Sequence, residues 1–308
     1  MAAMLSAASA MAPTSRRKET AFLMNRSLTI GMLTYDDFDG VYFTLQSLRL
    51  HHPEAMEQVE FLILDNHSES AHGKAVRDLT AWVRQPLRYM PVTGRTGTAL
   101  RDMIFEHAQT PHVLCLDSHV MLAPGALARL IAYMDAGHDA GNLLQGPLIM
   151  DNLDQVQTHM EPVWRAGMWG IWAHDKRGDD MESPPFEIPA HGMGLFACRK
   201  DAWLGFNKDF RGFGGEECYI HEKFRQAGRK TLCLPFLRWL HRFARPAGVP
   251  YPNCWKDRIH NYLLGHAELG LDKEPVIKHF RSHLGDALVD SALPPITQPP
   301  QNHGLSPT

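Results

Sequence analysis

An aspartate and a histidine stand two residues apart where a short apolar stretch of the sequence ends. The stretch His112–Asp117 (HVLCLD) continues directly into Ser118 and His119. On an extended backbone, residues two apart project from the same face, so Asp117 and His119 can act together. One carboxylate oxygen and one imidazole nitrogen are suitable ligands for a divalent cation. The chain contains 18 histidines, however, and this spacing also fits an ordinary exposed loop.

Two further groups of residues favour a functional site at Asp117 and His119 over an ordinary exposed loop. Glu216 and Glu217 follow a pair of glycines and precede an amphipathic stretch, which predicts a helix that begins at the two carboxylates. The same pattern also fits a simple helix cap. His241 follows Trp-Leu at the predicted end of a strand, and by itself it is equally typical of a structural edge residue.

The N-terminal half predicts an α/β fold with a mostly parallel central sheet. Continuous apolar runs indicate buried strands, and helical stretches lie between them. The predicted strands are 28–34, 59–65, 112–117 and, more weakly, 87–92; the predicted helices are 43–51, 74–84, 98–109 and 126–136. Ligands of such sheets bind beyond the carboxyl ends of the strands. Asp65 and Asp117 both fall at that edge.

The C-terminal half is less regular. Residues 145–189 are rich in Trp, Met, Pro and Gly with little periodicity, and predict a long loop over the sheet. A helix over 218–227 and amphipathic helices over 256–269 and 275–284 follow. The aromatic segment 164–172 and the loop 242–255 are expected to flank the site.

Bulk composition excludes several classes of protein. A net charge of −3 gives no general attraction to nucleic acid, and no apolar run reaches the roughly 20 residues of a membrane span. Five scattered cysteines without a CxxC pair indicate neither a disulfide framework nor a zinc knuckle, and we expect a cytoplasmic protein. Residues 1–26 predict a disordered leader and residues 291–308 a disordered, proline-rich tail.

Five features resemble those of the GT-A glycosyltransferases and occur in the same order along the chain. They are Arg101, Asp117-Ser-His119, the MGLF element, Gly-Gly-Glu-Glu and His241-Arg-Phe. The pattern is most similar to the polypeptide N-acetylgalactosaminyltransferase-like group of family 2 glycosyltransferases. The resemblance spans roughly 28–243. It implies a Rossmann-like GT-A catalytic domain over 27–245, followed by a helical extension over 246–290.

The resemblance also implies the ligands and the residues that bind them. It implies Mn²⁺, with Mg²⁺ as the alternative, held by Asp117, His119 and His241 together with the diphosphate of a UDP-sugar. The implied nucleotide contacts are Thr34, Tyr35, Asp65 and Arg101. Without the resemblance, Asp65-Asn66 also fits a turn after a strand, and Arg101 also fits the solvated face of a helix. Glu216 and Glu217 are the implied catalytic residues. The implied reaction moves a hexose or N-acetylhexosamine to a hydroxyl acceptor on a glycan, protein or nucleic-acid base.

One departure from the pattern leaves the stereochemistry open. The residue after Gly-Gly-Glu is commonly Asn in the retaining group, whereas this chain has Glu217, which can act as the base of an inverting reaction. Two other functions remain alternatives: a glycosyltransferase that acts on a DNA base, and an inactive module that binds a glycan or nucleotide.

Overall fold

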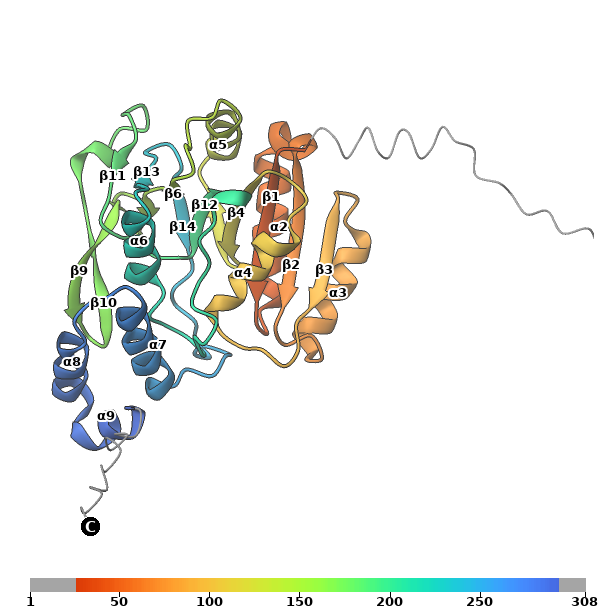
Figure 1. Ribbon diagram of the computed structural model, residues 1–308. Coiled ribbons are helices and arrows are strands. Elements are labelled where there is room, and N and C mark those ends of the chain that lie inside the picture. The colour runs from red at the N-terminus through yellow and green to blue at the C-terminus, as the bar shows by residue number, and fades with distance from the viewer. Residues whose placement is uncertain (1–25, 294–308) are drawn as a thin grey trace, which may run out of the picture.

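A computed structural model describes residues 26–293, and its core is an eight-stranded mixed sheet with helices on both faces (Figure 1). The strand order is β11-β13-β6-β12-β4-β1-β2-β3. The strands of this sheet are β1 (Leu28–Thr34), β2 (Val59–Asp65), β3 (Leu87–Pro91), β4 (His112–Asp117), β6 (Leu143–Gln145), β11 (Phe186–Glu187), β12 (Leu195–Arg199) and β13 (Thr231–Cys233).

The four strands β1, β2, β3 and β4 run parallel, which confirms the predicted fold class. The strands β1, β2 and β4 have the predicted bounds, and their residues are almost all buried. Their register pairs Thr34 with Asp65 and Leu33 with Asp117. The carboxyl ends of β1, β2 and β4 therefore lie level at one edge of the sheet.

Alternation along the strands divides the apolar core into two layers. Leu114 and Leu116 of β4 pack on the face covered by α2 (Phe38–His51), α3 (Ala71–Trp82) and α5 (Ala126–Asp135). Val113 and Cys115 pack on the opposite face, against α4 (Asp102–His107) and α6 (Glu217–Gln226). Burial on both faces explains why these strands are continuously apolar.

The prediction of a long loop over 145–189 is wrong. This segment forms β7 (Leu148–Ile149), β8 (Val156–Gln157), β9 (His159–Arg165) and β10 (Met168–Ala173) before β11. The strands β9 and β10 form an antiparallel hairpin with a turn at Ala166 and Gly167, both at positive φ. The hairpin is half-exposed and interrupted by a bulge, so its sequence lacks a clear alternation of apolar and polar residues.

A second, four-stranded sheet joins the middle of the chain to its later part, in the order β5-β14-β7-β8. β5 (Val120–Leu122) follows Asp117 after one turn, and β14 (Trp239–His241) pairs antiparallel with it. This pairing places the end of β14 beside the end of β4.

The helices of the C-terminal extension are α7 (Trp255–Glu268), α8 (Glu274–Leu284) and α9 (Asp286–Ala292). They pack on one another and on the hairpin β9–β10 through Trp164, Tyr262 and Phe280 (Figure 1). The helix predicted over 98–109 is instead a 3-10 turn, Thr98–Arg101, followed by α4, and α2 begins five residues earlier than predicted, with Asp37 as its N-cap.

The predicted leader and tail lie outside the described residues, except for residues 26 and 291–293, of which Ser291 and Ala292 still belong to α9. Within residues 26–293, no helix has the length and apolarity that a membrane crossing requires.

Candidate active site

Asp117, His119 and His241 converge at the carboxyl edge of the main sheet. Asp117 ends β4, and the ladder between β5 and β14 pairs His241 with Val120, next to His119. The Nε2 atoms of His119 and His241 are 3.1 Å apart, and Nε2 of His241 is 3.4 Å from Oδ2 of Asp117. One ligand atom from each residue lies within 4.8 Å of the other two. The structure thus brings His241 next to Asp117 and His119, which precede it by 124 and 122 positions in the sequence.

The three side chains fit one divalent cation. Ligands at right angles around a cation with bonds of about 2.1 Å are about 3 Å apart, close to the separation of the two Nε2 atoms. Nδ1 of His119 faces Oδ2 of Asp37 at 2.7 Å, which favours a proton on Nδ1 and a lone pair on Nε2. Burial lowers the pKa of His119 and keeps its imidazole neutral, as ligation requires.

Asp37 is a functional residue that the sequence prediction missed. Its Oδ2 atom contacts His119, and its Oδ1 atom accepts from Arg242 at 2.8 Å and from the backbone N–H of Gly40. Burial opposes ionisation of Asp37, but the hydrogen bonds and charges of His119 and Arg242 outweigh it and hold its pKa well below the usual range. Asp37 therefore orients His119 as an ionised carboxylate.

Arg101 connects the two acidic parts of the site. Its guanidinium donates to Oδ1 of Asp117 at 2.6 Å and lies 3.6 Å from Oε1 of Glu216. Burial disfavours the charge of Asp117, but Arg101 and the two histidines hold the pKa of Asp117 well below its usual range. Arg101 is only 5% exposed. It is thus buried between two carboxylates and is not a solvated helix residue.

Glu216 and Glu217 stand at the start of α6, after Gly214 and Gly215, both at positive φ. A Cβ at Gly214 would lie 2.6 Å from Arg258, and one at Gly215 would lie 2.9 Å from Asn261, so only glycine permits this close approach to α7. Burial, with the neighbouring Glu216 charge second, raises the pKa of Glu217 to about 8. Within the described residues, Oε2 of Glu216 is buried without a hydrogen-bond partner.

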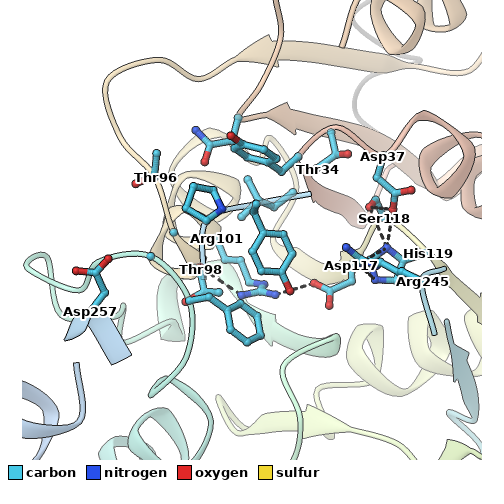
Figure 2. Close-up of a pocket in the computed structure, with 18 residues that line it drawn as sticks. Thr34, Asp37, Thr96, Thr98, Arg101, Asp117, Ser118, His119, Arg245 and Asp257 are labelled. Atoms are coloured by element: carbon cyan, nitrogen blue, oxygen red, sulfur yellow. Dashed lines mark hydrogen bonds and ion pairs between the residues drawn. The ribbon is translucent and has the colours of Figure 1, made fainter. Parts of the chain in front are cut away.

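A pocket of about 150 Å³ opens at this edge of the sheet and is lined in part by Asp117 and His119. Figure 2 shows Asp37, Ser118 and His119 gathered at one end of this pocket and Thr96 and Asp257 at the other. Of the four residues that the sequence predicts to contact the nucleotide, Thr34, Tyr35 and Arg101 line this pocket.

The structure does not place Asp65 on the pocket. Asp65 is fully buried, with Oδ2 accepting from Tyr89 at 2.7 Å and Oδ1 from the backbone N–H of His67. The neighbouring Asn66 lines the pocket instead. The role of Asp65 is therefore to hold the end of β2 and the turn after it.

A second cavity, of about 330 Å³, adjoins the first and shares Asp117 and His119 with it. Its polar lining includes Glu216, Glu217 and His241, together with the arginines Arg101, Arg242 and Arg245. The hairpin β9–β10 contributes Met168 and Trp172, and the loop after His241 contributes Phe243 and Val249. Both segments that the sequence predicts to flank the site therefore do so.

The model of glycosyl transferase family 2 matches residues 29–202, which is more than half of the chain. This chain belongs to glycosyl transferase family 2. No curated protein matches its sequence. Solved structures share the fold of this glycosyltransferase, among them GalNAc-T7 with UDP, GalNAc and Mn²⁺, at 15% identity and a TM-score of 0.63.

The alignment covers 84% of this glycosyltransferase and 54% of GalNAc-T7, so this chain spans about half the length of GalNAc-T7. The mannosyltransferase PcManGT from Pyrobaculum calidifontis, in complex with GDP-Man and Mn²⁺, is similar over 91% of this chain and 79% of its own. Its identity is 13% and its TM-score 0.52. These likenesses confirm the predicted GT-A fold.

We expect Asp37→Asn to weaken Mn²⁺ binding by the glycosyltransferase about 10- to 100-fold, because the substitution removes the charge that orients His119. Asn preserves an oxygen that can cap α2, so the fold should persist. Calorimetric titration with Mn²⁺ measures the effect. Asp39→Asn, in the first turn of the same helix, is the matched control. Unchanged affinity in Asp37→Asn contradicts the assignment.

Arg245 contacts the nitrogen that a cation would use. Its guanidinium donates to Nε2 of His119 at 2.8 Å. We therefore expect Arg245→Gln to tighten binding of Mn²⁺ alone by about tenfold, because removing one nearby positive charge is worth about 1 kcal/mol or more at a partly buried site. Electron paramagnetic resonance of free Mn²⁺ measures this, with Arg281→Gln on α8 as the control. Weaker binding in Arg245→Gln is the opposite result and rejects competition between Arg245 and the cation.

Proposed function

We propose that this protein is a metal-dependent glycosyltransferase that moves a hexose or N-acetylhexosamine from a UDP-sugar to a hydroxyl acceptor. The observation that carries the proposal is the convergence of Asp117, His119 and His241 between two adjoining cavities. A nucleotide sugar has a diphosphate between its nucleoside and its sugar. The two cavities and the ligand set between them match that order of parts.

The smaller pocket is the proposed nucleoside site. Tyr35 stacks on His67 at a ring distance of 4.7 Å and presents an aromatic surface at the end of β1. Thr34, Asn66 and Thr96 add polar groups for the ribose and the base. GalNAc-T7 with UDP supports a uridine nucleotide, and the complex of PcManGT with GDP-Man makes GDP-sugars the donors to compare with it.

Asp117, His119 and His241 are the proposed ligands of Mn²⁺, with Mg²⁺ as the weaker candidate because two of the three ligands are nitrogens. Both of these solved relatives were determined with Mn²⁺. The bound cation would neutralise the charge of the departing nucleoside diphosphate. Arg101 keeps Asp117 ionised and fixed, which makes it a positioning residue in this proposal.

Glu216 and Glu217 are the proposed catalytic residues of the larger cavity. The unpartnered Oε2 atom of Glu216 is available to accept a hydrogen bond from a hydroxyl of the donor sugar. Glu217, with its raised pKa, can take the proton of the acceptor hydroxyl near neutral pH. The acceptor oxygen then bonds to the anomeric carbon as the bond from that carbon to the phosphate oxygen breaks.

The cysteines support a reducing compartment such as the cytoplasm. All five lie within the described residues and all are free thiols. Four are buried, and only Cys254 is exposed. Secreted enzymes of this size more often use their cysteines in disulfides.

Thermal-shift titration with a panel of nucleotide sugars, with and without Mn²⁺, tests the proposed donor and cation. We expect stabilisation by a UDP-sugar only when Mn²⁺ is present, because ligand binding to the native state raises the melting temperature. The hit is then tested for slow hydrolysis by water. Hydrolysis separates an enzyme from an inactive binding module, and salt-dependent binding of duplex DNA would support the alternative of a DNA-base acceptor.

A further inference from the structure

The larger cavity has an inner and an outer part with different chemistry. Glu216, Glu217 and His241 form the inner part, next to the proposed cation. The outer part is lined by Met168 and Trp172 of β10 and by the exposed Phe243 and Val249 of the loop after β14. In the proposed function, the sugar attached to the diphosphate occupies the inner part. The outer part is then left for the acceptor.

The outer part is an apolar surface that nothing in the described chain covers fully. Phe243 is 52% exposed and Val249 is 46% exposed, although both line the cavity. The ring of Phe243 lies 4.3 Å from the ring of His241, directly beside the ligand set. Apolar side chains that remain exposed in a cavity are typical of a site for an apolar ligand.

Trp172 forms a fixed wall of this surface. A Cβ at Gly192 would lie 2.9 Å from the indole ring, so the ring rests directly on the backbone of Gly192. His191 also packs edge to face against the indole, at a ring distance of 5.0 Å. An aromatic ring held in this way loses little conformational entropy when a flat ligand packs on it.

The charges of the cavity disfavour an anionic acceptor. Glu216 and Glu217 are acidic, and two of the three arginines of the lining are paired with carboxylates. Arg101 pairs with Asp117 and Arg242 with Asp37, whereas Arg245 donates to Nε2 of His119, a contact that a cation bound there would break. A phosphate on the acceptor would lie beside Glu216 and Glu217, with Arg245 as the lining arginine that no carboxylate of the described residues pairs with.

We infer that the acceptor is an uncharged hydroxyl compound with an aromatic or alkyl group next to the reacting hydroxyl. The inference rests on the proposed function and names the substrate class of that site. The apolar group packs between Trp172 and the pair Phe243 and Val249, and this contact directs the hydroxyl toward Glu217. The reacting hydroxyl loses its proton to Glu217 and forms the new bond to the anomeric carbon as the nucleoside diphosphate leaves.

The test compares acceptors that differ only in their apolar group. The full chain, with Mn²⁺ and the UDP-sugar found by thermal shift, is supplied with benzyl β-glucoside, methyl β-glucoside, glucose or glucose 6-phosphate. We expect kcat/KM to be at least about tenfold higher for benzyl β-glucoside than for methyl β-glucoside, since burying one aromatic group is worth more than 1.4 kcal/mol. We expect glucose 6-phosphate to be the poorest acceptor.

Two variants locate the effect. Trp172→Ala and Phe243→Ala should each raise KM for benzyl β-glucoside about tenfold more than KM for the UDP-sugar. Phe243 is half-exposed on a loop, so its variant should fold even if Trp172→Ala does not. Trp82 ends α3, and its side chain is 85% exposed. Trp82→Ala removes the same kind of side chain at a distance from the cavity and should change neither KM. Calorimetric binding of benzyl β-glucoside in the presence of UDP and Mn²⁺ provides a readout without turnover.

The outcomes separate the inference from the function on which it rests. If donor hydrolysis occurs but the benzyl and methyl glucosides react equally, or glucose 6-phosphate reacts best, the inferred acceptor class is wrong. The proposed glycosyltransferase function is then still supported by the hydrolysis. If no UDP-sugar is bound or hydrolysed, the proposed function is wrong, and the inference falls with it.

Discussion

His241→Ala should lower kcat/KM for sugar transfer by about 10³-fold or more and should abolish the stabilisation of the protein by Mn²⁺. Cation catalysis of this type is worth several kcal/mol, and a factor of 10³ corresponds to about 4 kcal/mol. The substitution removes a ligand that lies 3.1 Å from His119 and 3.4 Å from Asp117, without emptying a core position. The fold should therefore persist.

The measurement is a radiometric transfer assay at a fixed UDP-sugar concentration, before and after EDTA, with Mn²⁺ added back. His51→Ala, at the exposed end of α2, is the matched control and should retain full activity. Full activity in His241→Ala together with insensitivity to EDTA would falsify the metal site. A loss of activity without a loss of Mn²⁺ affinity would instead place His241 on the substrate.

Glu217→Gln should lower kcat by about 10²- to 10⁴-fold, the usual contribution of a general base, with a smaller change in the donor KM. Only the deprotonated carboxylate accepts a proton, and burial together with Glu216 raises the pKa of Glu217 to about 8. In the unsubstituted protein, kcat should therefore rise with pH up to about 8 and then level off.

Stopped assays from pH 6 to 9.5 with a buffer series of constant ionic strength measure this profile. Gln has nearly the same size as Glu, so Glu217→Gln tests the proton and not the packing, and its residual activity should not rise across this range. Glu222→Gln, on the same helix beyond the cavity, is the control. A profile that is unchanged in Glu217→Gln assigns the titration to another group and removes the base from Glu217.

Local sequence was sufficient for the strands that build the edge of the site. Residues 28–34, 59–65 and 112–117 are covered on both faces, and this burial leaves a continuous apolar signal that a single sequence displays. The residues after these strands then fall at one edge by topology alone. Asp117, His119 and His241 required more: their order in the chain resembled a known family, and the pairing of β5 with β14 supplies the contact.

Roles that depend on a distant partner were not predictable in the same way. Asp65 has the expected position at the strand end, but its carboxylate accepts a hydrogen bond from Tyr89, 24 residues later. Arg101 lines the pocket at which it was expected, but its contacts with Asp117 and Glu216 were not predictable from its position in the sequence. Asp37 was not among the predicted residues, and only its contact with His119 reveals its role. The hairpin β9–β10 was missed because half-exposed strands with a bulge lack a strong periodicity.

The distribution of the thiols provides a direct means of observing the loop that begins after His241. Cys254 is exposed at the last position before α7, whereas the other four cysteines are buried. Burial also raises the pKa of the Cys115 thiol to about 12. A maleimide fluorophore should therefore attach to the native chain at one place only, at the far end of that loop from His241. Its emission would report on the loop as nucleotide and cation are added, without any engineered cysteine.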